Sequence, residues 1–404
     1  MFGLKDFFQK KQDKALEKQS LKEVIIAKIQ QFLARIGKKR MIIIGTAISL
    51  LIIVGWIVFG RKTSYTDYTV TSIAARVDTS ATKYVPFKGK ILKYSLDGVS
   101  YVDSNNKAIW NHTYSIQKPI IDVVEDAIVI AEQRGNHIYI FNEKGLIGSI
   151  NTTRPILKVK VSNQGNVLAV LEDGEKILIN LYDVKGEEIA KSSQTLEQAG
   201  YPMDIALSPD SKKTMVSFLT VNNDEVSSNI AFYNYGSVRS SQGSNLVNSI
   251  NYKNAIIPQT KYINNNIAVA VRDNGFSIYK GAQIPDEIAN ITFTTEIQSV
   301  YYSKTNVGFI FRNADSEEKY KMVIYDLTGK LIFEENFNLE YTRIELDEKQ
   351  VIIMGEKECS IYSLKEKLLY TGVFEQTLIG IFGQDKIGKY TVITTNAVMN
   401  IKLK

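Results

Sequence analysis

Few residues in this sequence have side chains suited to catalysis or metal binding. Cys359 is the only cysteine, so no intrachain disulfide can form, and it lies in a strand-like stretch with no matched histidine. The two histidines, His112 and His137, cannot build a His-rich zinc centre alone. We interpret Cys359 as a buried structural thiol and the histidines as surface or satisfied core residues.

Acidic residues suggest two other kinds of chemistry. Segments 103–106 and 222–225 are rich in Asp and Asn, whose oxygens could ligate calcium. Calcium needs six or more converging oxygens, so we interpret both segments as solvated turns and leave them unassigned. The neighbouring pairs Glu187–Glu188 and Glu317–Glu318 would point to opposite faces of a strand, which is poor geometry for acid–base catalysis.

No established catalytic motif is present. The sequence lacks a Gly-rich phosphate loop, a His-Glu-x-x-His motif, a nucleophile elbow and an EF-hand loop. We therefore assign no catalytic, cofactor-binding or metal-binding residue, expect no cofactor, and predict that the protein is not an enzyme. Trp110, Tyr301 and Tyr302 could line a binding face, but we favour packing between sheets as their role.

Short strands must position all of these residues. From about residue 84, runs rich in Val, Ile, Tyr, Phe and Thr alternate with Gly, Asn and Asp turns. One unit recurs: a strand ends, Asp or Asn follows, then two residues, a Gly or Asn, and a second strand. Such a turn specifies a hairpin, because Asp or Asn bonds the turn backbone and Gly or Asn tolerates positive φ. The clear copies contain Asp103, Asn142, Asp183 and Asp326, and weaker copies contain Asn234, Lys280 and Ser363.

The spacing of these units predicts an all-β fold, a β-propeller of four-stranded blades. The strand ends are 37 to 51 residues apart, which brackets the period of propeller blades. Seven units and a final strand at 397–403 make eight blades, and seven is the alternative because weak copies are easily miscounted. The last blade lacks a fourth strand. Residues 68–74 could supply it and close the ring.

The N-terminal region predicts a single membrane anchor. Residues 1–40 contain eleven Lys or Arg against four Asp or Glu, whereas the other 364 residues carry a net charge near −1. Residues 41–60 form an uncharged apolar run, long enough at about 1.5 Å per residue to cross a bilayer. The excess of basic residues before this run places the N-terminus in the cytoplasm and the rest of the chain outside the cell.

Four regions follow from these patterns. They are a basic cytoplasmic tail (1–40), a transmembrane helix (41–60), a linker with the possible ring-closing strand (61–83), and an extracytoplasmic propeller (84–404). Within the tail, the pattern of residues 20–36 predicts an amphipathic helix. This helix either binds anionic lipid or a cytoplasmic partner, or it has no role beyond setting the orientation of the membrane anchor. Nucleic acid is excluded as the main partner, because the basic excess lies in the tail and not on the folded domain.

Two motifs carry a resemblance to known propellers. Residues 103–110, with Asp103, Asn106 and Trp110, resemble the turn-and-Trp signature of quinoprotein-like (PQQ-type) blades, and residues 204–213 resemble the blade-opening turn of WD40-like and TolB-like propellers. In layout the chain is similar to a domain-of-unknown-function family of single-pass, membrane-anchored propeller proteins of clostridial-type Gram-positive bacteria. The quinoprotein likeness is architectural, because those dehydrogenases typically use a vicinal cysteine pair and a calcium site.

The expected function is a binding, scaffold or sensing module in the cell envelope. Its partners would be envelope proteins or peptides, or alternatively glycans, recognised by loops on rigid blades. The alternative is an extracytoplasmic enzyme, quinoprotein-like or glycan-acting, with its site in the funnel. A cluster of Asp and Glu around the funnel would favour the enzyme, and a lining of mixed polar and aromatic residues would favour binding. Signal transfer to the cytoplasm through the 20–36 helix is a third hypothesis.

Overall fold

The structure is a computed structural model that describes residues 49, 64–222, 225–236, 245–313, 316–365, 367–384 and 386–404. The predicted helix at 20–36 lies outside the described residues, as does the predicted transmembrane helix at 41–60 apart from residue 49. Within the described ranges, no helix is both long and apolar enough to cross a membrane. Residues 64–404 form one compact unit.

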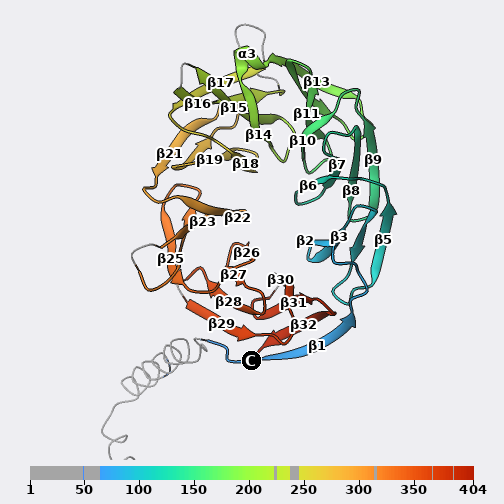
Figure 1. The fold of residues 1–404 in the computed structure, drawn as a ribbon, viewed down its shortest axis with the longest axis vertical. Coiled ribbons are helices and arrows are strands. Elements are labelled where there is room, and N and C mark those ends of the chain that lie inside the picture. Colours follow the sequence, from blue (N-terminus) through green and yellow to red (C-terminus); the bar gives the residue numbers. More distant parts are fainter. Residues whose placement is uncertain are drawn as a thin grey trace, which may run out of the picture. The chain divides into compact units, whose positions relative to one another are not determined.

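In this unit, eight antiparallel sheets of four strands stand around a central channel (Figure 1). This confirms the eight-bladed prediction, and the seven-bladed alternative is wrong. Blades 1 to 7 each use four consecutive strands, ordered from the channel outwards. Blade 8 has the order β30-β31-β32-β1, so the two ends of the propeller meet in one sheet.

The strand bounds show this regular progression. The inner strands are β2 (Lys83–Phe87), β6 (Pro119–Val123), β10 (Ile156–Val161), β14 (Tyr201–Leu207), β18 (Gln259–Asn264), β22 (Ile297–Tyr302), β26 (Arg343–Leu346) and β30 (Leu378–Gly383). The second strands are β3 (Lys90–Tyr94), β7 (Ile128–Glu132), β11 (Val167–Asp173), β15 (Lys213–Asn222), β19 (Ile267–Arg272), β23 (Asn306–Arg312), β27 (Gln350–Met354) and β31 (Lys389–Thr394).

The third and outer strands complete the blades. The third strands are β4 (Gly98–Val102), β8 (His137–Asn142), β12 (Lys176–Tyr182), β16 (Glu225–Asn234), β20 (Gly275–Lys280), β24 (Tyr320–Asp326), β28 (Glu358–Ser363) and β32 (Ala397–Leu403). The outer strands are β5 (Ala108–Thr113), β9 (Gly145–Asn151), β13 (Glu188–Thr195), β17 (Leu246–Lys253), β21 (Asp286–Thr292), β25 (Leu331–Phe337), β29 (Lys367–Val373) and β1 (Tyr68–Ala75). One short helix, α3 (Leu196–Ala199), links β13 to β14.

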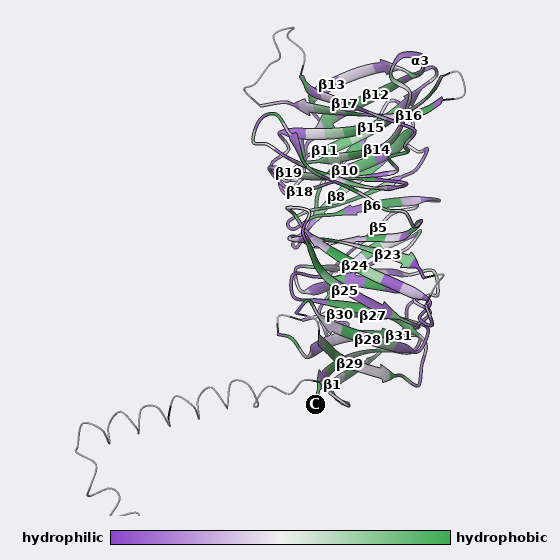
Figure 2. Ribbon diagram, turned by 90° about the vertical axis from the view of Figure 1, so that its left-hand side faces the viewer, coloured by the Kyte–Doolittle hydropathy of each residue, from purple (hydrophilic) through white to green (hydrophobic). Residues whose placement is uncertain are grey.

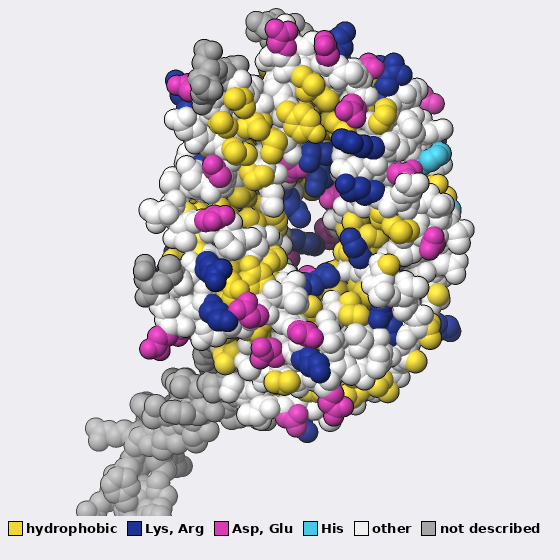
Figure 3. Space-filling model, in the orientation of Figure 1, with side chains coloured by type: hydrophobic (Ala, Val, Ile, Leu, Met, Phe, Trp, Pro, Cys, Tyr) yellow, Lys and Arg dark blue, Asp and Glu magenta, His cyan; other side chains and the backbone are white. Residues whose placement is uncertain are grey.

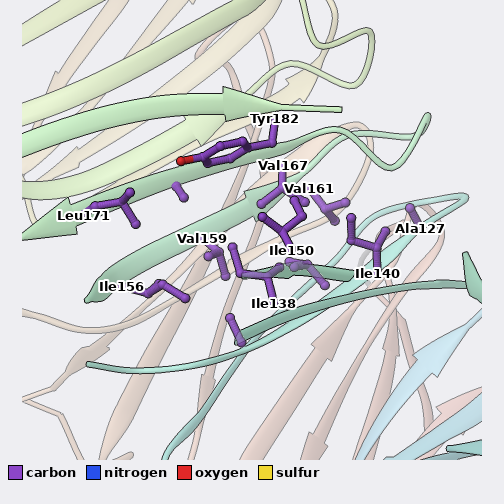
Figure 4. Close-up of a cluster of buried hydrophobic side chains, with 13 residues drawn as sticks. Ala127, Ile138, Ile140, Ile150, Ile156, Val159, Val161, Val167, Leu171 and Tyr182 are labelled. Atoms are coloured by element: carbon purple, nitrogen blue, oxygen red, sulfur yellow. The ribbon is translucent and has the colours of Figure 1, made fainter. Parts of the chain in front are cut away.

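The hydrophobic core is divided among the contacts between neighbouring blades. Eight buried clusters each join the facing sides of two adjacent blades, so every blade is packed on both faces. Figure 4 shows the cluster between blades 2 and 3, where Ile138 and Ile140 face Val159 and Val167. Burial on both faces explains why second strands such as Val167–Leu171 read as continuous apolar runs. In side view, hydrophobic residues follow the strands and the turns are mainly hydrophilic (Figure 2).

The ring closes through β1. It pairs antiparallel with β32 from Tyr68↔Leu403 to Ala75↔Ala397, as the spare strand in the sequence predicted. Just before β1, the backbone N–H of Tyr65 donates to the carbonyl of Leu369 on β29 at 2.7 Å. The first residues of the propeller are therefore tied to blades 7 and 8 together.

Candidate functional site

Asp103, which was considered for calcium, and Asp183 and Asp326 of the same hairpin pattern are used by turns. In the β12–β13 hairpin, Oδ1 of Asp183 accepts hydrogen bonds from the backbone N–H groups of Lys185 (2.8 Å) and Glu187 (2.9 Å). Gly186 closes the turn with a φ of 86°. The same pattern recurs at Asp103 with Asn105 and Lys107, and at Asp326 with Thr328 and Lys330. These carboxylates stabilise hairpins, as their spacing predicted.

Replacing Asp326 tests this assignment. Asp326→Ala removes the acceptor of two backbone amides and of the Thr328 hydroxyl, and should destabilise the propeller by about 1–2 kcal/mol in urea unfolding. Asp326→Asn is the matched control, because Asn142 fills the equivalent position in blade 2 and should largely preserve stability. EDTA should leave the unfolding midpoint unchanged, and a lower midpoint in EDTA would restore the calcium interpretation.

The same turn has a predictable pH dependence. Partial burial acts to raise the pKa of Asp326, but hydrogen bonds from Thr328 and from two backbone amides lower it, on balance, below 3.8. The stabilisation is therefore complete above pH 3.8 and is lost as the pH falls through the lowered pKa.

The other candidate residues are dispersed over the fold. Cys359 is 1% exposed on β28, between blades 7 and 8, where burial raises the pKa of its thiol to about 12. His137 is exposed, and His112 is half-buried with its ring 5.5 Å from the rings of Tyr139 and Phe141. Cys359 therefore lies in a core between two blades, whereas His137 lies at the surface of blade 2.

The aromatic candidates divide between packing and the channel. Trp110 stacks on Phe141 of blade 2 at 5.5 Å, and its indole N–H donates to the carbonyl of Glu143 at 3.0 Å, so it packs between blades as predicted. Tyr301 packs in the core between blades 6 and 7. Tyr302 packs against the core between blades 5 and 6, and it also donates its hydroxyl to Gln259 on the neighbouring inner strand at 3.3 Å.

The acidic pairs do not converge. Glu188 accepts a hydrogen bond from the Asn180 side chain at 3.0 Å, and the side chain of the adjacent Glu187 is exposed. Glu318 accepts from the Ser316 hydroxyl at 2.7 Å, in a surface loop. Asn222 and Glu225 face each other at the tip of the β15–β16 hairpin, and residues 223–224 lie outside the described residues.

The central channel brings charged side chains together, and we treat it as the candidate site. The eight inner strands contain five Lys or Arg and three Asp or Glu, although residues 41–404 as a whole have a net charge near −1. Figure 3 shows the open channel with Lys and Arg side chains gathered around its mouth. Positive charge is therefore concentrated at the centre of the ring.

Two aspartates are held between adjacent blades. Asp122 of β6 accepts a hydrogen bond from the backbone N–H of Val161 at 3.0 Å and lies 3.6 Å from the ammonium of Lys160. The nearby negative charge of Asp122 raises the pKa of Lys160, against the opposing effect of burial. Asp122 thus fixes blade 2 to blade 3.

Asp204 has the same role one blade further on. It accepts from the backbone N–H of Thr260 at 2.8 Å and lies 3.8 Å from the ammonium of Lys158. Its contacts join blade 4 to blades 3 and 5. Both channel aspartates are therefore already engaged by a backbone amide and a lysine.

Lys261 of β18, unlike Lys158 and Lys160, has no carboxylate within ion-pair distance among the described residues. Its ammonium lies 5.2 Å from the ring centre of Tyr302, and no ion pair forms with it in the described part of the chain. Desolvation lowers the pKa of Lys261, and the positive charge of nearby Lys160 lowers it further. The negative charge of Asp122 acts in the opposite direction. Burial also raises the pKa of Tyr302, which therefore stays protonated at neutral pH.

The opposite wall of the channel is balanced in charge. Arg343 of β26 pairs with Glu345 of the same strand at 2.5 Å, and its guanidinium lies 5.0 Å from the ring centre of Phe382. Arg343 also donates to the carbonyl of Tyr84 in blade 1 at 3.2 Å. The lining is thus polar, aromatic and cationic, with each of the three inner-strand carboxylates paired.

Sequence reasoning named the propeller funnel as a place for a site but did not identify the residues that line it. Its signal was a charged residue in each of several short apolar strands, such as Asp122 in Pro119–Val123 and the two lysines in Ile156–Val161. Such residues read as ordinary solvent-facing positions until the ring places them around one channel. Among the described residues, no group of three or more His, Cys, Asp or Glu converges.

Comparisons with known proteins agree with the fold. A sequence profile described as a family of unknown function (DUF5711) matches residues 61–403. A search of curated proteins finds no match. The crystal structure of BamB from Moraxella catarrhalis is similar with a TM-score of 0.50 and 11% identity, over 83% of this chain and 100% of that chain. The crystal structure of Chaetomium thermophilum Sqt1 has a TM-score of 0.50 and 11% identity, over 84% and 97% of the two chains. Identities this low show the propeller fold alone.

Proposed function

We propose that this chain, which belongs to the DUF5711 family, uses its propeller as a non-enzymatic module that binds other proteins. The observation that carries the proposal is the state of the channel carboxylates. Asp122 and Asp204 each hold a backbone amide and a lysine, and Glu345 holds Arg343. Asp122 and Asp204 thus fix neighbouring strands, and Glu345 is paired within its own strand, while the cationic and aromatic groups beside them are suited to recognition.

The rigidity of the ring supports the same proposal. Cores on both faces of every blade and the β1–β32 closure hold the loops and the channel lining in fixed positions. A preformed surface loses little conformational entropy on binding, which favours affinity. The alternative of an enzyme in the funnel gains no support from paired carboxylates, because acid–base catalysis needs a carboxyl group free to exchange protons.

We further propose that the propeller works outside the cell membrane, on partners in the cell envelope. Support comes from the sequence: an uncharged apolar run at 41–60 follows eleven basic residues. A single-pass anchor there would hold residues 61–404 outside the cytoplasm.

One experiment tests both parts of the proposal. Intact cells that express the full chain are treated with a membrane-impermeant amine cross-linker, and the captured proteins are identified by mass spectrometry. The expected result is a reproducible set of envelope proteins, absent when β1 is replaced so that the ring cannot close. Capture of no protein would contradict the binding function. Failure of the impermeant reagent to label the propeller, with labelling after lysis, would contradict the external location.

A further inference from the structure

The charges of the channel point to the chemistry of a partner, an inference that rests on the proposed binding function. We propose that the central channel binds an extended acidic segment of a partner protein, whose carboxylates pair with Lys158, Lys160 and Lys261. We call these three residues the lysine cluster.

The first support is the charge balance of the lysine cluster. Three ammonium groups face two carboxylates, and both carboxylates already accept backbone hydrogen bonds between blades. Lys261 is left with the ring of Tyr302 as its neighbour. The Lys261 side chain is exposed to solvent, and desolvation by the surrounding blades lowers its pKa; a carboxylate from a ligand would supply a charge partner and oppose that effect.

The second support is the separation of the cations along the channel. Lys158 and Lys160 lie two residues apart on β10 and alternate with the buried Val159 and Val161. Two residues of a strand span about 6.8 Å, which is also the spacing of side chains on one face of an extended peptide. Alternate acidic residues of an extended peptide therefore match the spacing of the two lysines.

The third support is access to the channel. Lys304, just after β22, forms a 3.0 Å ion pair with Glu125, just after β6. These residues belong to blades 6 and 2, which are opposite in a ring of eight, so the pair spans the channel where the inner strands end. Lys158 and Lys261 are the third of six residues in β10 and β18, and Lys160 is the fifth residue of β10, so Lys158 and Lys261 lie nearer than Lys160 to the mouth where the inner strands begin. A peptide can therefore reach the lysine cluster from the other mouth.

Tyr302 adds a recognition group on the far side of Lys261. Its ring packs beside the ammonium, and its hydroxyl donates to Gln259 at 3.3 Å. With that proton donated to Gln259, the hydroxyl oxygen of Tyr302 can still accept a hydrogen bond from a peptide N–H, and the Gln259 side-chain NH₂ can donate one to a peptide carbonyl. The arrangement combines charge recognition with contacts that depend little on sequence.

The test uses the full-length chain in a non-ionic detergent. The probe is a fluorescein-labelled peptide of alternating Gly and Glu with four glutamates, and its Gly-Gln counterpart is the neutral control. Fluorescence anisotropy should show salt-sensitive binding of the Gly-Glu peptide and none of the Gly-Gln peptide. Lys261→Glu should weaken binding about tenfold, because it removes one charge contact with the peptide and adds repulsion between the new carboxylate and the glutamates of the peptide.

Matched variants separate the channel from general charge effects. Lys185→Glu makes the same charge change on an exposed turn outside the channel and should leave binding unchanged. Lys261→Gln and Lys160→Gln are milder variants, with thermal unfolding measured for each to show that the fold is intact. Weaker binding in these two variants would support the channel site.

Several outcomes would overturn the inference. The inference fails if the two peptides bind equally, or if the Gly-Glu peptide does not bind at low salt. It also fails if Lys261→Glu and Lys185→Glu weaken binding by the same factor. Finally, it fails if acetate competes for the site as effectively as the unlabelled peptide does at the same concentration of carboxylate groups. If the Lys261→Glu variant captures the same envelope proteins in cells as the parent chain does, the binding function stands and the channel inference fails. If neither protein captures a partner, the proposed function fails as well.

Discussion

Replacing β1 by eight alternating Gly and Ser residues is expected to open the propeller and to lower the urea concentration at which it unfolds. β1 contributes seven residue pairs to β32, and cross-strand pairs are worth about 0.2–1 kcal/mol each, so the expected loss is roughly 1–7 kcal/mol. That is a large part of the stability of a typical domain, about 5–15 kcal/mol. Far-UV circular dichroism of the full chain during urea unfolding measures it.

Side-chain contacts at the closure add to this loss. Tyr68 stacks on Phe374 at 5.2 Å, and Asn400 donates to the Ser72 hydroxyl at 2.7 Å. Just outside β1, Asp67 pairs with Lys404 at 3.0 Å. The replacement removes the contacts of Tyr68 and Ser72 but leaves the Asp67 pair in place, so the change reports mainly on the strand.

A matched control keeps the strand and changes only its exposed face. Val70 is 45% and Ile73 is 66% exposed. The double variant Val70→Thr and Ile73→Thr keeps β-branched side chains and all backbone pairs, so its stability should stay within about 0.5 kcal/mol of the parent. Equal midpoints for the parent and the Gly-Ser replacement would show that β1 does not close the ring.

Cys359 is expected to react with iodoacetamide about a thousandfold more slowly in the native protein than in urea. Burial raises the pKa of the thiol from 9.0 to about 12, which cuts the reactive thiolate about a thousandfold at neutral pH, and enclosure by the core slows the reagent further. Because the chain has one cysteine, mass spectrometry of the alkylated protein reports this residue alone.

A relocated thiol controls for the reagent. In the variant Cys359→Ala with Lys185→Cys, the new thiol lies on an exposed turn and should react at the same rate with and without urea. A native rate for Cys359 within tenfold of the rate in urea would show an accessible thiol and overturn its assignment as a core residue. Since Cys359 packs between blades 7 and 8, its alkylation should also accelerate when β1 is replaced.

The hairpin turns show what short-range sequence can predict. At Asp103, Asp183 and Asp326 the side-chain acceptor and its amide donors lie within four residues, so the segment specifies its own conformation. Asn106 even takes a φ of 65° where related blades prefer Gly, as its tolerance of positive φ suggested. Strand positions were predictable for the same reason, because burial on both faces leaves continuous apolar runs.

The blade count and the ring closure needed one global argument beyond local pattern. Tyr68 and Leu403, which pair at the closure, are at opposite ends of the propeller sequence, so no local signal joins them. Counting strands left one blade a strand short and one strand spare. Left unpaired, the last blade and the spare strand would each expose an open strand edge. Pairing β1 with β32 removes both edges, which is the physical reason why the predicted ring closure is confirmed.

The channel was not predictable in this way. Lys160 and Lys261 lie in different blades, and each looks like an ordinary solvent-facing residue of a short strand. Only the closed ring places their charges within range of each other and of Asp122. The sequence alone therefore determined the strands and the turns, because these depend on nearby residues, and counting its strands predicted the eight blades; the anchor at 41–60 stays a prediction. The tertiary structure decided which side chains meet in the channel, because that depends on the positions of distant blades around one axis.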